Sequence, residues 1–322
     1  MPVVNAPTHQ RTNALIIICG PTAVGKTRIG IELAKHFNGE IVSADSQQVY
    51  RGLDIGTAKP SAEERAAVKH HLMDVVSPDQ PFDVAKFVEL ADEAISAIAA
   101  SGRVPFVVGG TGLYIRALTQ GLVEAPGRDE KFREDLKNIE TPKLHEMLSE
   151  KDPETAARLN SNDTTRIVRA LEVLHLTGRS ISEIQKDHEF KEKRYQTLKI
   201  GLNVEREELY RRINERADKM IEAGLVEEVG GLVEKYGPDC QALRALGYNE
   251  LVHVIASGAK QSSALDCHAP SGLAMTVNQI KQNTRRYAKR QLTWFRTDPE
   301  IRWFEPGDVE KMKKVVEIFL QR

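Results

Sequence analysis

The chain has 322 residues, of which 41% are hydrophobic and 28% charged, and its formal net charge is −1. This composition fits a soluble globular protein of about two domains. The nearly balanced charge excludes a globally basic nucleic-acid-binding protein, so an RNA or DNA partner would need a local basic patch. The three cysteines form no C-x-x-C pair, which indicates reduced thiols and excludes a structural zinc built on such pairs.

The apolar run near the N-terminus, from Leu15 to Cys19, is far too short to span a membrane. No charged leader precedes it, so we expect no secretory signal. Together with the reduced cysteines, this predicts a cytoplasmic protein that is not attached to a membrane.

The first third of the chain alternates predicted strands and helices. Apolar runs predict buried parallel strands over residues 14–20, 39–46 and 104–112. Helical spacing of apolar residues predicts helices over residues 26–37 and 85–102. This order predicts an α/β fold with a parallel sheet and right-handed crossovers.

The character of the sequence changes at about residue 121. Residues 121–194 contain no convincing strand, and prolines at their breaks indicate short helices. We interpret this segment as a helical insertion domain. The α/β core then consists of residues 1–120 and 195–322 and carries basic helices towards its C-terminus.

The second part of the core returns to strands and helices. We expect Asp308 to be the N-cap of a closing helix. Residues 256–274 are small, polar and rich in turn formers, which predicts a surface loop or a partly disordered segment without a catalytic role. The other predicted elements are a strand within residues 195–204, helices over 205–236 and 273–293, and a strand followed by a helix over 301–320.

A glycine-rich stretch lies where the first predicted strand meets the first predicted helix. It satisfies the pattern G-x-x-x-x-G-K-[ST] at every fixed position. The glycines let backbone N–H groups turn towards anionic oxygens, Lys26 supplies a cation, and the Thr27 hydroxyl can bind Mg²⁺. This predicts a di- or triphosphate site in a P-loop NTPase-like core. The cradle residues are Gly20, Pro21, Thr22, Ala23, Val24, Gly25, Lys26 and Thr27.

The carboxylate of Asp45 follows the second predicted strand. Ligands bind beyond the carboxyl ends of strands in an open parallel sheet, so we expect Asp45 near the cradle. Three interpretations stay open: an N-cap, a partner of Mg²⁺ as in nucleotide hydrolases, or a general base that faces an acceptor.

The third predicted strand ends in "GGTG". Gly109 and Gly110 allow the backbone to approach a ligand closely, and Thr111 offers a hydroxyl. A tight turn without ligand contacts is the alternative interpretation.

Two groups of arginines stand on predicted helices. Arg216 falls on an apolar face, at i+3 from Ile213, and either extends to the surface or points into a site that holds negative charge. Arg166 and Arg169 lie three residues apart on one helical face, where solvated charge is the simpler interpretation.

The densest basic run is "KQNTRRYAKRQLTWFR", which contains no acidic residue. Its like charges repel one another in an isolated helix, which indicates an anionic partner such as an RNA backbone. Tyr287 and Trp294 could stack on bases, although core packing is the more frequent fate of such aromatics. The basic residues of the run are Lys281, Arg285, Arg286, Lys289, Arg290 and Arg296.

Seven motifs appear in the chain in this order: "GPTAVGKT", "IVSADSQQVYRGLDIGTAKP", "HHLMDVVSP", "VVGGTGLYIRAL", "DTTRIVRALEVL", "RALGYNEL" and "NTRRYAKRQLTWFR". In this combination the chain resembles the tRNA dimethylallyltransferase, or tRNA isopentenyltransferase, family. The resemblance spans about residues 15–305, and no C-x₂-C…H-x-H pattern follows residue 290, so it implies the bacterial type. It implies transfer of the dimethylallyl group from dimethylallyl diphosphate to N6 of the adenosine 3′ of the anticodon in tRNA, with release of diphosphate.

The resemblance also implies roles for individual residues. Thr22 to Thr27 would hold the diphosphate. Besides this cradle, the residues implied at the reaction site are Asp45 as the base on the acceptor amine, Thr111, Arg133, and Arg216 against the diphosphate. The residues implied to contact tRNA, besides the basic run, are Asp45, Ser46, Gln47, Gln48, Thr165, Arg166, Ile167, Val168, Arg169, Arg244, Ala245, Leu246, Gly247, Tyr248 and Asn249.

Other functions share some of these features. A P-loop small-molecule kinase would have the cradle and the acidic strand end, and the lack of an N-K-x-D motif disfavours a GTPase. An adenylate isopentenyltransferase, which acts on free AMP, ADP or ATP, would leave the basic run without a purpose. A non-catalytic RNA-binding protein would not need the cradle. We expect tRNA, dimethylallyl diphosphate and Mg²⁺ as partners of a monomeric enzyme.

Overall fold

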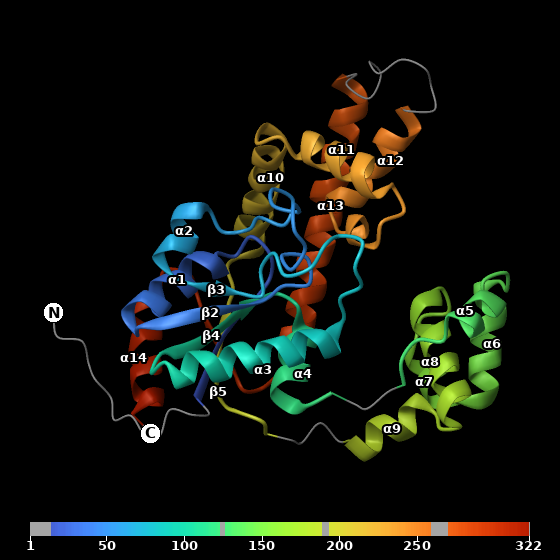
Figure 1. Ribbon diagram of the computed structural model, residues 1–322, viewed down its shortest axis with the longest axis horizontal. Helices are drawn as coiled ribbons and strands as arrows, with labels where there is room; N and C mark the ends of the chain where they lie inside the picture. Colours follow the sequence, from blue (N-terminus) through green and yellow to red (C-terminus); the bar gives the residue numbers. More distant parts are fainter. Residues whose placement is uncertain (1–13, 123–125, 189–192, 259–269, 322) are drawn as a thin grey trace. The chain divides into compact units, whose positions relative to one another are not determined.

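The computed structural model describes residues 14–122, 126–188, 193–258 and 270–321. By its internal contacts the chain divides into two compact units, which can be followed in Figure 1. We call residues 1–119 with 194–322 the core unit, and residues 120–193 the insertion unit. The boundaries expected from the sequence lie one residue later.

The core unit is built on one six-stranded sheet, with the strand order β3-β2-β4-β1-β5-β6 and parallel pairing throughout. The strands expected from apolar runs are confirmed, because such runs are buried on both faces of a parallel sheet. The short β3 is not predicted from the sequence, because it consists of two histidines and not of an apolar run. The strands are β1 (Ala14–Cys19), β2 (Gly39–Ala44), β3 (His70–His71), β4 (Val104–Gly109), β5 (Gln196–Leu202) and β6 (Ile301–Phe304).

Three neighbouring strands end in register. Cys19 of β1 and Ala44 of β2 both pair with Gly109 of β4, so the segments after these strands start at the same level of the sheet edge. No side chain fits at position 109, because a Cβ atom there would lie 2.1 Å from the Ala44 carbonyl oxygen. The P-loop, Asp45 and Thr111 all follow this edge.

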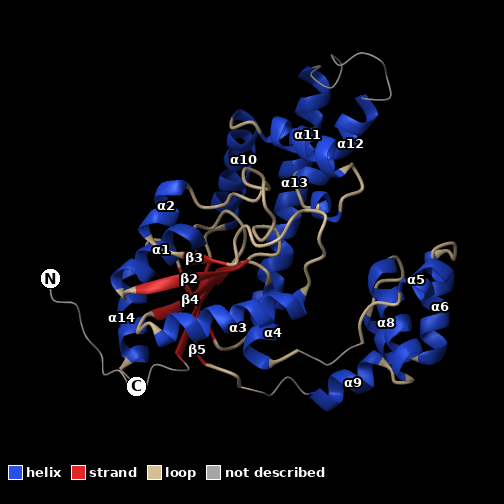
Figure 2. Ribbon diagram, in the orientation of Figure 1, coloured by secondary structure: helices blue, strands red, loops and turns tan. Residues whose placement is uncertain are grey.

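Helices cover both faces of the sheet, as Figure 2 shows. The helices of the core unit are α1 (Lys26–His36), α2 (Ala62–Ala67), α3 (Val84–Ala100), α4 (Gly112–Gln120), α10 (Arg206–Glu222), α11 (Leu225–Tyr236), α12 (Tyr248–Gly258), α13 (Pro270–Phe295) and α14 (Val309–Leu320), with the 3₁₀ helix η1 (Gln241–Arg244). One apolar cluster joins Ile16 and Ile18 to α1, α10 and α14. A second cluster joins Leu15 and Ile17, on the opposite face, to α3 and α4. The long α13 packs along α10 (Figure 1).

Two details of the helices differ from the expectation. The stretch 205–236 forms two helices, because Gly224 adopts a left-handed conformation with a φ of 96° between α10 and α11. Asp308 precedes α14, but its side chain does not cap the helix. Its carboxylate instead accepts a hydrogen bond from the Glu305 N–H at 3.2 Å and pairs with Lys311 at 2.7 Å.

The expectation of a loop over the polar segment 256–274 is wrong at both of its ends. α12 continues to Gly258 and α13 begins at Pro270. Residues 259–269 lie outside the described residues.

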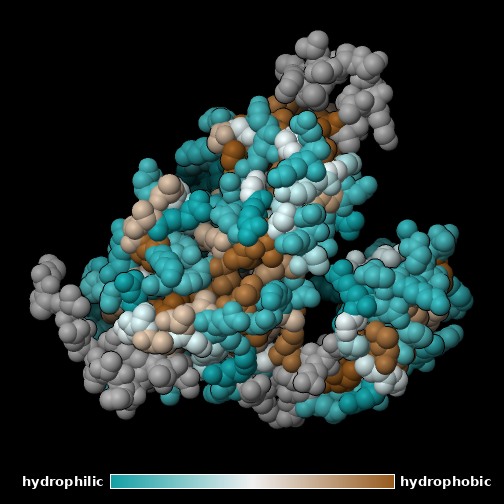
Figure 3. Space-filling view, viewed as in Figure 1, coloured by the Kyte–Doolittle hydropathy of each residue, from teal (hydrophilic) through white to brown (hydrophobic). Residues whose placement is uncertain are grey.

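Hydrophilic residues cover most of the face drawn in Figure 3. Within the residues that the structure describes, none of the helices combines the length and the hydropathy needed to cross a bilayer.

The insertion unit forms only helices within its described residues. They are α5 (Glu130–Leu136), α6 (Thr141–Lys151), α7 (Pro153–Arg158), α8 (Thr164–Thr177) and α9 (Ile181–His188). The side chains of Asp129, Asp152 and Asp163 accept backbone N–H bonds at the starts of α5, α7 and α8. The small core of the unit consists mainly of Leu136, Leu144, Leu148, Ile167 and Leu171.

The chain leaves the core unit and returns to it at adjacent points. The Arg194 N–H donates to the Thr119 carbonyl oxygen at 3.3 Å, and the Arg194 guanidinium donates to the Leu118 carbonyl oxygen at 3.2 Å. The same guanidinium pairs with Asp92 of α3 at 2.6 Å. The two ends of the insertion are therefore held together by the core unit.

A fully buried carboxylate, Glu172 of α8, organises the insertion unit. It accepts hydrogen bonds from Arg133 at 2.6 and 2.8 Å, from Arg169 at 2.5 Å and from the Asp129 N–H at 2.9 Å. Burial acts to raise the pKa of the Glu172 carboxyl, but the bonds from Arg133 and Arg169 outweigh it and lower this pKa to about 2.

We expect Glu172→Gln to remove a stabilisation that depends on pH. Because the folded-state pKa is lowered, the stabilisation is fully present above the ordinary carboxyl pKa of 4.5 and is lost as the pH falls from there towards 2. Melting temperatures from circular dichroism should therefore differ most between wild type and variant at pH 7 and converge near pH 2–3. A difference that stays constant with pH would contradict this assignment.

Candidate active site

The glycine-rich stretch forms a curled loop between β1 and α1, as the sequence predicted. Its backbone turns through left-handed conformations at Ala23, with a φ of 63°, and at Gly25, with a φ of 106°. α1 then begins at Lys26, so its unbonded N–H groups point out of the helix start. Such a loop aims several N–H groups at one anion, and the helix N-terminus adds positive potential.

The loop opens into a cavity of about 1230 Å³ in the core unit. Of the residues predicted for the site, this cavity brings together cradle residues, the turn that begins at Asp45, the segment from residue 244, and Arg216. The lining residues relevant to ligand binding and catalysis are Thr22, Lys26, Thr27, Asp45, Arg216, Arg244, Tyr287 and Arg290.

Three charged groups of the cavity influence one another. Burial lowers the pKa of Lys26 to about 8, against the opposing effect of Asp45 and with a contribution from Arg216. Burial also lowers the pKa of Arg216, and Asp45 again opposes it. Arg216 lines the cavity and therefore does not extend to the outer surface. These three groups together present two cations and one carboxylate, whose balance a bound anion would change.

Asp45 shapes the turn that follows β2. Its Oδ1 accepts hydrogen bonds from the N–H groups of Gln47 at 2.9 Å and Gln48 at 3.3 Å. The first interpretation, an N-cap, is thus partly right, although a turn and not a helix follows. Thr111 lies behind this turn and accepts a hydrogen bond from the Ser46 N–H at 3.2 Å.

Two glycines of "GGTG", Gly110 and Gly112, let another part of the protein approach the backbone closely. A Cβ atom at Gly110 would lie 2.3 Å from Nε2 of Gln291, and one at Gly112 would lie 2.2 Å from the Trp294 indole. Both partners belong to α13. Neither interpretation of this motif anticipated helix packing, because the partner helix is almost two hundred residues away in the sequence.

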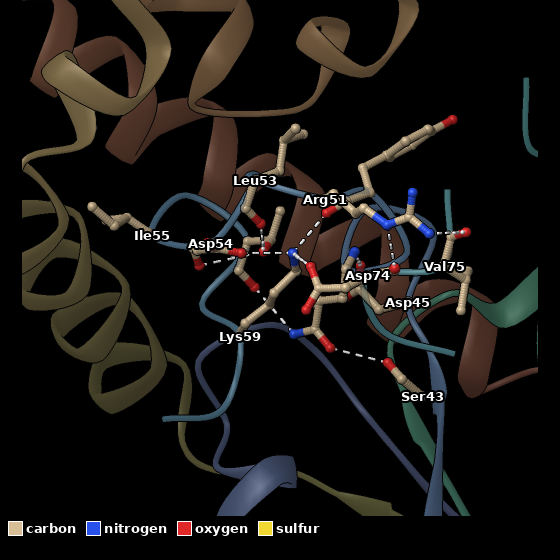
Figure 4. Close-up of polar contacts among 12 residues, drawn as sticks. Ser43, Asp45, Arg51, Leu53, Asp54, Ile55, Lys59, Asp74 and Val75 are labelled. Atoms are coloured by element: carbon tan, nitrogen blue, oxygen red, sulfur yellow. Dashed lines mark hydrogen bonds and ion pairs between the residues drawn. The ribbon is translucent and has the colours of Figure 1, made fainter. Parts of the chain in front are cut away.

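The wall beside Asp45 is held by a buried ammonium group, which Figure 4 shows. The Lys59 side chain is 2% exposed and donates to the Tyr50 carbonyl oxygen at 2.6 Å, to Asp54 at 2.7 Å and to Asp74 at 2.5 Å. Gln48 holds the loop just before Lys59, because its amide nitrogen donates to the Thr57 carbonyl oxygen at 3.2 Å. Lys59 is not among the residues predicted for the site. Its position in the motif "DIGTAKP" is the one sequence signal that points to it.

Gln48 and Tyr248 are bonded within the fold. Gln48 is buried at the wall of the cavity and also accepts a hydrogen bond from the Ser43 hydroxyl at 3.0 Å. Tyr248 is fully buried, donates to Glu228 at 2.5 Å and accepts from the Gly56 N–H at 3.1 Å. The contact of these two residues with tRNA stays a prediction, as it does for Ser46, Gln47 and residues 244–247 and 249.

The basic run on α13 has two sides. Lys281 pairs with Asp218 of α10 at 2.6 Å, and Arg285 donates to Asn214 of α10 at 2.6 Å. The argument from mutual repulsion therefore fails for these two residues, because α10 supplies the partners that α13 lacks. The side that remains exposed consists of Arg286, Lys289 and Arg290.

The predicted residues of the insertion unit differ in exposure. Ile167 is fully buried in the core of the unit, and its contact with tRNA stays a prediction. Arg169 donates to the Pro126 carbonyl oxygen at 2.8 Å and to Glu172, and Arg133 also pairs with Glu172. Thr165 and Arg166 are exposed and Val168 is half-buried. The roles of Arg133 and of the 165–169 segment stay predictions.

A curled glycine loop between a parallel strand and a helix that starts with Lys and Thr defines a P-loop protein of the α/β class. Residues 48–298 match the family model described as "IPP transferase", and residues 13–76 match the model described as "Isopentenyl transferase". The chain belongs to the IPP transferase family.

Curated relatives are similar over nearly the whole chain. "tRNA dimethylallyltransferase 1" of Pelobacter propionicus is 48% identical over 296 residues, which cover 90% of this chain and 92% of that protein. "tRNA dimethylallyltransferase" of Geobacter metallireducens is 49% identical over 316 residues, with coverages of 96% and 98%. The family resemblance inferred from the sequence motifs is thus confirmed.

Solved structures of the same kind share the fold. The full-length tRNA isopentenylpyrophosphate transferase from Bacillus halodurans has a TM-score of 0.68 and 38% identity, covering 96% of this chain and 97% of that one. A eukaryotic dimethylallyltransferase described as acting on tRNA has a TM-score of 0.72 and 30% identity, with coverages of 88% and 69%.

We expect the affinity for inorganic pyrophosphate to fall as the pH rises above about 8, because Lys26 then loses its charge in the empty cavity. The variant Lys26→Arg stays charged in this range and should show a weaker dependence on pH. Calorimetric titrations between pH 7 and 9 measure both proteins against the same ligand, so the ligand's own titration cancels in the comparison. Identical pH profiles would contradict the assignment.

Proposed function

We propose that the protein transfers the dimethylallyl group of dimethylallyl diphosphate to the N6 amine of the adenosine 3′ of the anticodon in tRNA, and releases diphosphate. The observation that supports this most directly is the shared cavity of Lys26, Arg216 and Asp45. The two cations suit a diphosphate leaving group, and the carboxylate suits an amine that must lose a proton. The names of the similar relatives support the donor and acceptor.

The cradle acts on the leaving group. Breaking the allylic C–O bond leaves a delocalised, cation-like carbon and adds negative charge to the diphosphate oxygens. The N–H groups of the curled loop, the Lys26 ammonium and the Arg216 guanidinium stabilise this charge as it develops. The phosphate itself is released and is not transferred.

Asp45 acts as the general base on the acceptor. The lone pair of adenine N6 is conjugated into the ring, so a proton must leave as the new C–N bond forms. Oδ1 of Asp45 is occupied by the N–H groups of Gln47 and Gln48. Its Oδ2 accepts no hydrogen bond from the residues that the structure describes, which leaves this oxygen to take the proton.

Mg²⁺ fits the phosphate side of the cavity. The Thr27 hydroxyl lines the cavity, and the described residues hold no cluster of three or more His, Cys, Asp or Glu side chains that could bind an ion alone. Such a site with few protein ligands suits Mg²⁺, which keeps several waters and shares phosphate oxygens. A Mg²⁺ ion bound at Thr27 would supply charge neutralisation to the diphosphate.

The exposed side of α13 supports tRNA as the acceptor. Arg286, Lys289 and Arg290 are exposed, and Arg290 and Arg244 also line the cavity. The target adenosine must leave its stack to reach Asp45, at a cost of a few kcal/mol. Interactions between these cations and tRNA phosphates offset that cost, and we propose that exposed residues of α8 contribute further interactions.

Other aspects of the proposal follow from the same groups. One chain supplies the cradle, the base and the basic surface, which supports a monomeric enzyme. A tRNA acceptor and reduced cysteines support a cytoplasmic location.

The main alternative is an adenylate isopentenyltransferase that acts on free AMP, ADP or ATP. Incubation of the protein with labelled dimethylallyl diphosphate, Mg²⁺ and either unmodified tRNA or AMP separates the two functions. We expect label in tRNA and none in AMP. Label in AMP but not in tRNA would favour the alternative. In a separate incubation with ATP and without tRNA, release of phosphate would favour a kinase or NTPase.

We expect Asp45→Asn to lower kcat by about 10²- to 10⁴-fold, because the amide cannot take the proton. The asparagine oxygen can still accept the two N–H bonds of the turn, so KM for tRNA should change little. Asp45→Ala, which loses the turn as well, is the comparison. Full turnover by the asparagine variant would remove Asp45 from the role of base.

We expect the combined change of Arg286, Lys289 and Arg290 to alanine to weaken tRNA binding. The slope of log affinity against log salt concentration should decrease by about 1 for each cation–phosphate pair that the change removes. The matched control is Lys281→Ala with Arg285→Ala on the same helix, whose side chains are bonded to α10. A filter-binding series from low to high salt would contradict the assignment if the control pair reduced the slope as much.

A further inference from the structure

Gln291 of α13 is a buried amide between two loops of the candidate active site. The residue is 7% exposed, and both polar ends of its side chain are bonded. Its Oε1 accepts a hydrogen bond from the Thr22 N–H at 2.8 Å, and its Nε2 donates one to the Gly110 carbonyl oxygen at 2.9 Å. The close approach of Gly110 leaves no space for a side chain at that position, so the amide is held between the P-loop and the turn after β4.

The bond to Thr22 fixes the start of the cradle's curl. The chain enters the left-handed conformation at the next residue, Ala23, and Lys26 ties the loop from its other side by donating to the Pro21 carbonyl oxygen at 2.8 Å. Because the Thr22 N–H is bonded to Gln291, an anion in the cradle is bound by the N–H groups of the residues after Thr22. The amide thus sets the position from which those groups are presented.

The same helix contributes to the cavity wall next to Gln291. Tyr287 stands one turn before Gln291 in α13, and Arg290 directly precedes it. Both residues line the cavity. We propose that Gln291 is a positioning residue for diphosphate, which does not touch the ligand but holds the P-loop in its binding shape against α13. This inference rests on the proposed function in one respect, namely that the cradle holds diphosphate.

The chemistry of glutamine suits this role because one side chain offers both a donor and an acceptor. Glutamate keeps the acceptor for Thr22, loses the donor for Gly110 and adds a negative charge near the anion site. Methionine keeps the length and loses both hydrogen bonds. The two substitutions therefore separate the bonds from the space that the side chain fills.

The test compares Gln291→Met and Gln291→Glu with wild type and with the control Gln279→Met, an exposed position on the same helix. Calorimetry with inorganic pyrophosphate and Mg²⁺ gives Kd, and steady-state kinetics give KM for dimethylallyl diphosphate and for tRNA separately. We expect Kd and the KM for dimethylallyl diphosphate to rise by about tenfold in the methionine variant and more in the glutamate variant. The KM for tRNA and the control variant should stay within about twofold of wild type.

Thermal melting of each variant separates positioning from folding. A variant that melts like wild type and binds pyrophosphate like wild type overturns the inference. Equal losses of affinity for pyrophosphate and tRNA also overturn it, because they indicate a general structural role. If the methionine variant does not fold, Gln291→Leu, which also lacks both hydrogen bonds and carries no charge, decides by the same criteria. Failure of the proposed function has a different signature, in which wild type binds pyrophosphate but transfers no prenyl group to tRNA.

Discussion

The register of β1, β2 and β4 is the constraint on which the rest of the site depends. Since Cys19 and Ala44 both stand opposite Gly109, the three segments that follow these strands leave the sheet at one level. A shift of one residue in any strand would turn the side chains of each face to the other face. It would also move the loop that follows the strand by one residue along the strand direction. Both faces are covered by apolar clusters, so packing holds the register against such a shift. The cradle, the carboxylate of Asp45 and the hydroxyl of Thr111 thereby owe their proximity to hydrophobic burial.

Polar side chains then shape the loops that the sheet has brought together. Lys59 holds the wall beside Asp45, the half-buried Glu228 accepts N–H bonds from the loop at residues 54–56, and Gln291 holds the P-loop. Each has its polar ends satisfied, which matters because an unpaired polar group away from water costs about 1–3 kcal/mol or more if charged. Glu228 and Gln291 come from distant parts of the chain, so these loops are positioned by the core unit and not by their own sequences alone.

The sequence predicts what depends on local pattern. The cradle is predictable because the motif specifies its own backbone shape, and the long strands are predictable because burial on both faces leaves continuous apolar runs. Gln291 is missed because its partners are far away in the sequence, and the pairing of Lys281 is misjudged because Asp218 stands on another helix. Lys59 is missed for another reason: its partners lie only 5, 9 and 15 residues away, but nothing in this polar stretch indicates that its ammonium group is buried. The Tyr248 hydroxyl supports a loop of the protein, a role that the family motif does not indicate, and the implied contact with tRNA stays a prediction.

The hydrogen bond between Arg194 and Thr119 has an architectural consequence. Because it closes the two ends of the insertion on each other, β5 can take its place beside β1 whatever lies between them. The intervening helices form a separate unit outside the sheet. The order of the strands therefore depends on the two ends of the insertion and not on the length or composition of the helices between them.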